Sequence, residues 1–185
     1  MTEKEMLEGC LKGDGTSQRK LFEFHSPRVF SLISRYVAEE DAAADVLQET
    51  FLRIFDSVGS FTWRGDGSLK AWIDRIAVNM ALNYLRNNRN MVMAQPVDEL
   101  GEEEPSDPDS SMVEKIDTDT LMGFIAELPD GYRTVFNLFC IEGLSHKQIA
   151  KQLGINEKSS SSQLARAKAL LGKRIKDYLN EQYDR

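Results

Sequence analysis

The sequence has few of the residues from which metal, redox and covalent catalytic sites are built. It contains two cysteines and two histidines among 185 residues, and these stand apart, without a CxxC motif or a His-rich cluster. Such a set does not support a zinc site, a disulfide framework or a catalytic triad. A glycine-rich phosphate loop is missing as well, so we expect no enzymatic activity, no cofactor and no metal. We expect Cys10 and Cys140 to be buried free thiols in a reducing cytoplasm.

Long apolar runs are also missing. No run approaches the roughly 18 residues that a membrane-spanning helix needs. The first stretch, MTEKEMLEGCLKGDG, is charged from its third residue, which is not typical of a secretory signal. With 41% hydrophobic and 29% charged residues, the composition is typical of a soluble folded protein. We therefore expect a cytoplasmic protein that does not insert into a membrane.

Basic residues are outnumbered overall, but the excess of acidic residues lies in one segment. The formal net charge is −7. Residues 98–119, DELGEEEPSDPDSSMVEKIDTD, hold ten acidic residues and one basic residue. The rest of the chain holds 20 acidic and 22 basic residues. Like charges, two prolines and several serines predict a flexible, extended linker. The alternative is a proline-interrupted surface loop within a single domain.

Apolar residues recur at helical spacing on both sides of this segment, and no pair of strands is evident. Before the segment, the spacing predicts helices over 3–12, 16–37, 41–57 and 68–89. After it, the predicted helices span 117–128, 131–142, 145–153 and 157–180. We therefore predict an all-α protein made of two small helical domains, residues 1–92 and 119–185, joined by a flexible acidic linker over residues 93–118.

Residues 144–171, LSHKQIAKQLGINEKSSSSQLARAKALL, are typical of a helix-turn-helix. Ser145 and Gln148 match a capping box at the start of one helix, and Gly154 supplies the left-handed residue that ends it. Asn156 can cap the second helix, which carries short polar side chains near its start, where such motifs meet base edges. The alternatives are a helical hairpin in any all-α domain and, for the serines, an ordinary frayed helix end.

The stretch DVLQETFLRIFDSV, residues 45–58, combines an apolar face with an unusual polar one. Phe51, Ile54 and Val58 belong to the inward stripe. Leu52 lies on the opposite side, in the middle of a face of hydrogen-bonding residues. A large apolar residue with a polar rim indicates a site where another protein docks. Single exposed leucines are common, so an isolated surface leucine is the alternative.

The stretch from residue 60 to residue 90 predicts a second contact surface. Its helix has two apolar faces, and between them runs a stripe of Arg75, Asn79 and Arg86 with Asn83 at its edge. Arginine and asparagine are side chains that bind phosphates and base edges. The loop before the helix holds the aromatic residues Phe61 and Trp63 next to glycines. Their rings can stack on bases taken out of a duplex. The alternative is that these aromatic residues belong to the core.

Together, these motifs resemble the extracytoplasmic-function (ECF) sigma factors, the small promoter-recognition subunits of bacterial RNA polymerase. The stretch DVLQETFLRIF is similar to the core-binding helix of region 2, and SLKAWIDRIAVNMALNYLRNNRN to the helix that reads the minus-ten element. The stretch LPDGYRTVFNLFCIEGLSHKQIAKQLGINE is similar to region 4, whose helix-turn-helix reads the minus-thirty-five element. The resemblance covers residues 16 to about 177, with the motifs in the family's order.

The resemblance implies a function and a set of contact residues. A sigma factor binds core RNA polymerase, directs it to promoter DNA, helps to melt the DNA and initiates transcription. The residues implied for core polymerase binding are Asp45, Gln48, Glu49, Leu52 and Arg53. Those implied for the minus-ten element are Phe61, Trp63, Arg64, Arg75, Asn79, Asn83, Arg86 and Arg89. Those expected at the minus-thirty-five element are Lys158, Ser159, Ser160, Ser162, Gln163 and Arg166.

The resemblance also implies an anti-sigma factor as a partner, and we expect the free protein to be a monomer. Two departures from the family pattern bear on which promoter is read. Lys158, Ser159 and Ser161 stand where the family often has a small residue, Thr and then a basic residue, and Asn83 replaces a common acidic residue. The alternative function is a helix-turn-helix regulator that acts without joining polymerase. A purely structural helical adaptor is a third class, but it leaves the arginine stripes unexplained.

Overall fold

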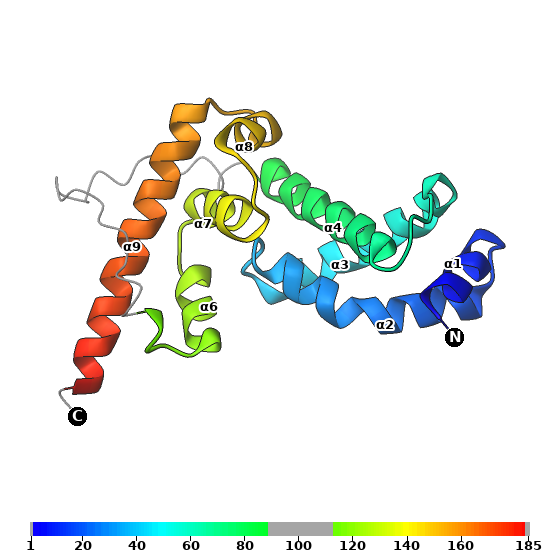
Figure 1. Ribbon diagram of the computed structural model, residues 1–185, viewed down its shortest axis with the longest axis horizontal. Helices are drawn as coiled ribbons and strands as arrows, with labels where there is room; N and C mark the ends of the chain where they lie inside the picture. Colours follow the sequence, from blue (N-terminus) through cyan, green and yellow to red (C-terminus); the bar gives the residue numbers. More distant parts are fainter. Residues whose placement is uncertain (1, 89–112, 184–185) are drawn as a thin grey trace. The chain divides into compact units, whose positions relative to one another are not determined.

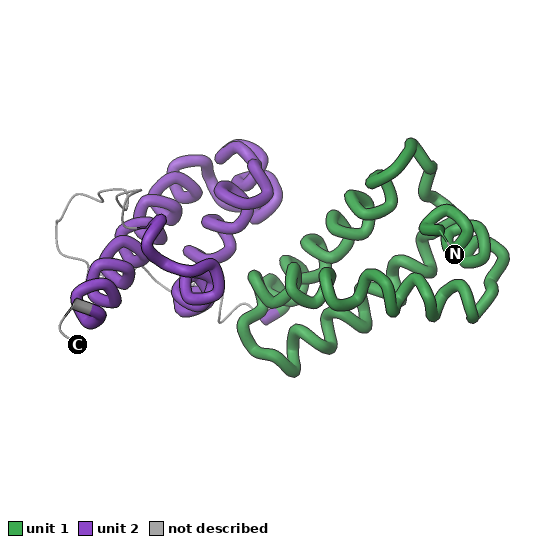
Figure 2. Tube along the Cα trace, turned by 60° about the horizontal axis from the view of Figure 1, so that its bottom comes forward, with its two compact units in different colours: residues 1–87 green, residues 88–185 purple. Residues whose placement is uncertain are grey.

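The computed structural model describes residues 2–88 and 113–183 (Figure 1). These residues form helices, and no strand occurs among them. The chain divides into two compact units, residues 1–87 and 88–185 (Figure 2). Within the described ranges, no helix is both long enough and apolar enough to cross a membrane. The acidic linker predicted over residues 93–118 lies mostly outside the described residues.

Unit 1 contains α1 (Glu3–Leu11), α2 (Gly15–Ser34), α3 (Glu40–Ser57) and α4 (Ser68–Asn87), with a short 3-10 turn at Val58–Ser60. Capping side chains fix where the first two helices begin. The backbone N–H of Glu5 donates to Thr2 Oγ1 at 3.2 Å, and that of Ser17 donates to Asp14 Oδ2 at 2.9 Å. The longer helices α2, α3 and α4 pack against one another. Their shared core holds the fully buried Leu21, Ile33, Ile54, Leu69 and Ile73.

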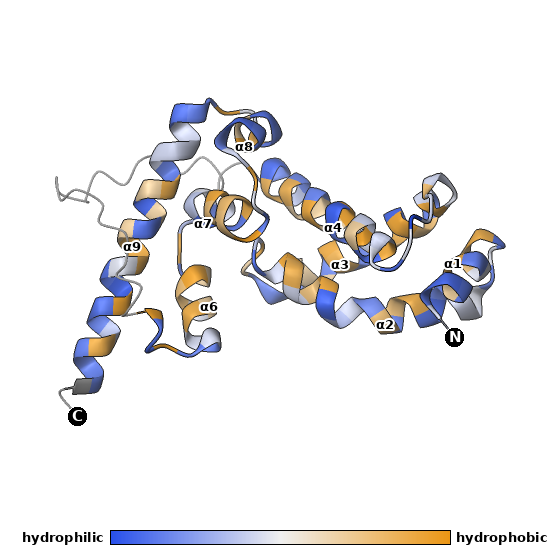
Figure 3. Ribbon diagram, viewed as in Figure 1, coloured by the Kyte–Doolittle hydropathy of each residue, from blue (hydrophilic) through white to orange (hydrophobic). Residues whose placement is uncertain are grey.

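Unit 2 contains α6 (Thr118–Ala126), α7 (Asp130–Phe136), α8 (His146–Leu153) and α9 (Glu157–Tyr183). A π-helical segment, η2 (Asn137–Ile141), follows α7 directly. The 27-residue helix α9 is the central helix of the unit, because α6, α7 and α8 all pack against it. The core of this unit contains Phe124, Ile125, Leu128, Tyr132, Ala167, Leu171 and Ile175. Figure 3 shows apolar and polar residues alternating along the helices, as expected when one face of each is buried.

All eight predicted helices are present, with differences at their ends. The helix predicted to run to residue 37 ends at Ser34, although Tyr36 and Val37 stay buried. The helix predicted over 131–142 changes to π-helical geometry at Asn137. The expectation that both thiols are buried is wrong for Cys140, which is exposed, whereas Cys10 is buried.

Candidate nucleic-acid interface

The polar stripe of α4 lies on the surface of unit 1. Arg75, Asn79, Asn83 and Arg86 are all exposed, and their spacing of four, four and three residues places them on one side of the helix. The opposite side packs Leu69, Ile73, Ala77 and Ala81 into the core, each fully buried. Burial of that apolar side therefore turns the polar stripe outward. The predicted exposure of the stripe is confirmed, while Arg89 lies outside the described residues.

The loop before α4 forms one wall of a pocket at the beginning of this stripe. The pocket has a volume of about 440 Å³ and is lined by Ser60, Phe61, Thr62, Arg64, Ser68, Ala71, Trp72 and Arg75. It therefore combines two aromatic rings, three hydroxyl groups and two guanidinium groups. The Phe61 and Trp72 ring centroids lie 5.1 Å apart, at an angle of 47° between the ring planes. This combination can stack against a flat polar group and form hydrogen bonds with it.

Two glycines and the hydrogen bonds of Ser68 determine the conformation of this loop. Gly65 and Gly67 have φ values of 106° and 81°, which residues with a side chain rarely adopt. Ser68 Oγ donates to the Gly65 carbonyl at 2.6 Å and accepts from the Arg64 N–H at 3.2 Å. Phe61 and Trp63 are both half-buried, and Phe61 is the one that lines the pocket. Trp63 is therefore placed beside the pocket rather than in its wall.

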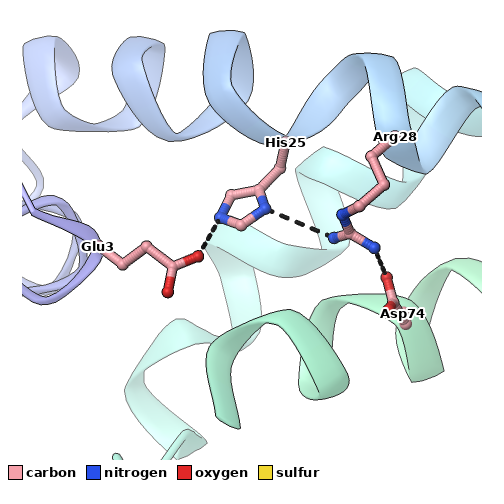
Figure 4. A network of polar contacts seen from close by, with 4 residues as sticks. All are labelled: Glu3, His25, Arg28 and Asp74. Carbon is pink, nitrogen blue, oxygen red and sulfur yellow. Dashed lines mark hydrogen bonds and ion pairs between the residues drawn. The ribbon is translucent and has the colours of Figure 1, made fainter. Parts of the chain in front are cut away.

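A partly buried polar network joins α4 to α1 and α2 (Figure 4). His25 is only 2% exposed, with its Nε2 3.3 Å from Glu3 Oε1 and its Nδ1 3.5 Å from a guanidinium nitrogen of Arg28. Arg28 in turn forms an ion pair with Asp74 on α4. Burial, followed by the positive charge of Arg28, lowers the pKa of His25 to about 4, although Asp74 acts in the opposite direction. The imidazole is therefore neutral at neutral pH.

The sequence does not reveal this network, because His25 stands in it as an isolated residue. Arg28 and Asp74 are 46 positions apart, and no local pattern indicates that they meet. Their ion pair ties α4 to α2 one residue before Arg75, at the start of the exposed stripe. The sequence gives no local signal for it, since α2 also carries Glu23, Ser26 and Ser31 around His25 and Arg28.

The face of α3 predicted to dock a protein is also on the surface. Leu52 is 65% exposed, and Asp45, Gln48, Glu49, Arg53 and Asp56 around it are exposed. On the other side of α3, Phe51, Ile54 and Val46 are buried. The helix thus presents a large apolar side chain to solvent although its core contacts are complete without it.

The two helices of the helix-turn-helix are α8 and α9. Ser145 and Gln148 form the predicted capping box, and Gly154 ends α8 with φ 70° and ψ 33°. Asn156 Oδ1 accepts from the Ser159 N–H at 2.7 Å, which caps α9 as predicted. The serine-rich segment is helical from Glu157 onward, so the structure does not have the frayed helix end that was the alternative for the serines.

The residues predicted on the DNA-facing side of α9 differ in exposure. Lys158 and Ser162 are exposed, and Ser159, Gln163 and Arg166 are half-buried. Ser160 is fully buried, and its hydroxyl lies 3.0 Å from Nδ1 of His146. The inclusion of Ser160 among the surface residues is therefore wrong, because the helical rotation of 100° per residue points it into the unit.

Comparisons with known proteins match both units. Residues 21–91 match the family described as Sigma-70 region 2, and residues 118–171 match the one described as Sigma-70, region 4. ECF RNA polymerase sigma-E factors of Salmonella typhimurium (strain LT2) and Escherichia coli (strain K12) are each 29% identical to this chain over 184 residues, which cover 95% of both chains. The solved structure of CnrH in complex with the cytosolic domain of CnrY is 19% identical, with a TM-score of 0.49, and covers 95% of this chain and 97% of that one.

Proposed function

Because the chain belongs to the ECF sigma factors, we propose that its two units divide promoter recognition between them. The chain is a promoter-recognition sigma factor that acts with RNA polymerase. In the proposed division, unit 1 binds core polymerase and the minus-ten element, and unit 2 binds the minus-thirty-five element. The observation that carries the proposal is the exposed stripe of α4, which leads directly into the loop pocket through the shared residue Arg75.

The stripe and the pocket have complementary tasks in opening the promoter. Arg75 and Arg86 bind phosphates, and Asn79 and Asn83, which can donate and accept hydrogen bonds, contact base edges. The pocket receives one unstacked base, with Phe61 or Trp72 against its face and hydroxyl groups at its edge. Stacking contributes about 1–3 kcal/mol per base, whereas taking a base out of a duplex costs a few kcal/mol. Capture of a single base therefore offsets much of that cost, and the phosphate contacts supply the remainder.

The face of α3 around Leu52 docks on core polymerase. A central apolar anchor with a polar rim is the arrangement in which a few residues carry most of the binding energy. Gln48 and Glu49 flank Leu52 on the exposed side of α3 and provide hydrogen-bonding partners at the rim, and Arg53 adds a positive charge. The DNA-binding stripe belongs to a different helix, so unit 1 can bind polymerase and DNA at the same time.

The first turns of α9 bind the minus-thirty-five element. Exposed and half-buried polar side chains at Lys158, Ser159, Ser162, Gln163 and Arg166 form the contact surface. Short hydroxyl side chains let the helix end come close to the base edges. The positive end of the helix macrodipole and Lys158 both favour nearby phosphates. Ser160 is left out of this surface because it is buried.

Sigma factors as a class act by binding rather than by catalysis, and we propose the same for this chain. Its site of action is then the cytoplasm, where it joins polymerase on promoter DNA. We propose an anti-sigma factor as a further partner, on the basis of the family, and a monomeric state for the free protein. In this proposal the anti-sigma factor covers the same α3 face as core polymerase, so changing Leu52 should weaken the binding of both partners.

The experiment that tests the proposal has two stages. The protein is first mixed with core RNA polymerase, and co-elution of the two on a sizing column is measured. The purified complex is then used for transcription from duplexes selected out of a randomised promoter library. Co-elution and initiation at a selected sequence support the proposal. DNA binding without co-elution would instead indicate a helix-turn-helix regulator that acts without joining polymerase.

A further inference from the structure

A partly buried hydrogen bond between a half-buried histidine and a buried serine connects the two helices of the helix-turn-helix. His146 is the first residue of α8, and Ser160 lies in the first turns of α9. Ser160 Oγ and His146 Nδ1 are 3.0 Å apart, and Ser160 is 0% exposed. A buried hydroxyl group that loses its partner destabilises the structure, because water does not replace the missing bond. The bond is therefore specific to one orientation of α9 relative to α8.

The imidazole of His146 is held from a second side by Phe139 of η2. The two ring centroids are 4.6 Å apart, and the ring planes differ by 21°, which is a stacked arrangement. Stacking fixes the plane of the imidazole, and the bond to Ser160 fixes the direction in which Nδ1 points. Three elements, η2, α8 and α9, thus meet at one side chain.

The place of Ser160 in α9 gives this contact a link to DNA recognition. Its neighbours Ser159 and Ser162 belong to the proposed DNA surface, and successive helix residues are rotated by 100°. Holding Ser160 inward therefore determines which side chains of the first turns face outward. If α9 turned by even a fraction of one residue step, Ser159, Ser162 and Lys158 would leave the positions from which they reach base edges.

We propose that His146 and Ser160 are a positioning pair that sets the rotation of α9 and thereby the sequence-specific affinity for the minus-thirty-five element. Neither side chain touches DNA. The inference rests on the proposed function of unit 2 and adds to it the residues that align the recognition helix. It applies whichever of the two atoms carries the shared proton, because either direction of the bond holds the same geometry.

The test uses the full-length protein in complex with core polymerase. The probe is a duplex selected by the wild-type complex from a library randomised at the minus-thirty-five position, and the reference is the same duplex with that element scrambled. Ser160→Ala is expected to lower the affinity for the selected duplex about fivefold to tenfold, as the loss of one hydrogen bond implies. The affinity for the scrambled duplex and for core polymerase should stay unchanged. Ser31→Ala, which removes an exposed serine hydroxyl group from α2 of unit 1, is the matched control and should behave as the wild type.

Variants of His146 separate positioning from general stability. His146→Phe keeps an aromatic ring next to Phe139 but removes the nitrogen, so it should lose affinity as Ser160→Ala does. His146→Asn keeps a polar atom at the position of Nδ1 and should retain most of the affinity. The double variant His146→Phe with Ser160→Ala removes both polar groups. Its loss of affinity for the selected duplex should be smaller than the losses of the two single variants combined.

Two results would overturn the proposal. One is an equal loss of affinity for the selected and the scrambled duplex, and the other is losses that simply add in the double variant. If the wild-type complex itself does not distinguish the two duplexes, the proposed function of unit 2 is wrong, and that outcome is read from the wild type alone.

Discussion

At the scale of single residues, Leu52 shows most clearly how an environment indicates a function. It is 65% exposed in a helix whose core side is already filled by Phe51 and Ile54. We predict that Leu52→Asp abolishes binding to core polymerase. The free energy of unfolding should change by no more than about 0.5 kcal/mol, since surface substitutions rarely cost more. Co-elution with core polymerase and urea-induced unfolding measure the two effects.

A matched control is available in the same unit. Leu11, at the end of α1, is 51% exposed and lies outside the proposed docking face. Leu11→Asp makes the same chemical change and should leave polymerase binding intact. Full affinity in Leu52→Asp would exclude the docking role, and marked unfolding would mean that Leu52 supports the core.

His25 gives a prediction about pH at the same scale. In the unfolded chain a histidine has its ordinary pKa of about 6.5, whereas in the folded protein that of His25 is lowered to about 4. Between these two values the unfolded state binds more protons, so the free energy of unfolding falls as the pH falls from about 6.5 to about 4. Replacing His25 by Gln removes this titration. Between pH 7 and pH 4.5, the free energy of unfolding of the wild type should therefore fall by on the order of 1–3 kcal/mol more than that of His25→Gln.

Urea-induced unfolding at a series of pH values measures this difference. Glu5, Asp14 and Asp117 have lowered pKa values through hydrogen bonds at helix starts, and they also destabilise the protein as the pH falls. Both proteins share these carboxylates, so they cancel in the comparison. Parallel pH profiles would show that the charges of Glu3 and Asp74 near His25 cancel the effect of its burial.

At the scale of elements, we predict that α4 makes two kinds of DNA contact, one with phosphates and one with base edges. Arg86→Ala should weaken binding of the polymerase complex to all promoters by a similar factor. It should also reduce the salt dependence of the affinity by about one unit of slope, as expected when one phosphate contact is lost. Asn79→Ala should instead change the preference among minus-ten sequences. Affinities for a set of minus-ten variants at several salt concentrations measure both effects.

Lys70→Ala is the control for this pair, because Lys70 is an exposed cation of α4 outside the stripe. It removes one positive charge, as Arg86→Ala does, and should alter the salt slope much less. If Arg86→Ala and Asn79→Ala have the same effect on every sequence, the division between phosphate and base contacts is wrong.

The elements also show what the sequence can reveal and what it cannot. Helices and caps are local, so the capping box at Ser145, the left-handed Gly154 and the outward turn of Arg75 and Asn79 follow from spacing alone. The place of Ser160 does not follow, because four successive serines look alike until the packing of α9 selects one of them. The Arg28–Asp74 ion pair joins α2 and α4 across 46 positions, and it depends on the tertiary fold. Local chemistry therefore predicts the surface, and the structure adds the polar contacts between distant residues that hold it.

At the scale of the whole molecule, charge is distributed very unevenly. The chain has a net charge of −7, and residues 98–119 alone hold ten acidic residues and one basic residue. The remaining sequence holds 20 acidic and 22 basic residues, which is a small positive balance for a protein with two proposed DNA surfaces. DNA is itself strongly negative, and its affinity for proteins depends on the net electrostatic interaction. The acidic segment should therefore repel DNA whatever its conformation.

We predict that neutralising this segment raises the duplex affinity of the free protein. The seven acidic residues of 98–109 are replaced by Ser and Asn. Asp117 is kept because it caps α6, accepting from the Thr120 N–H at 2.9 Å. The increase should be largest at low salt, because the Debye length is about 30 Å at 0.01 M and about 10 Å at 0.1 M, so screening removes the repulsion as salt is added. A variant with the same residues of 98–109 in scrambled order keeps the charge and should bind like the wild type. Binding titrations of all three proteins at the two salt concentrations provide the measurement, and equal affinities at low salt would mean that the segment acts only as a spacer.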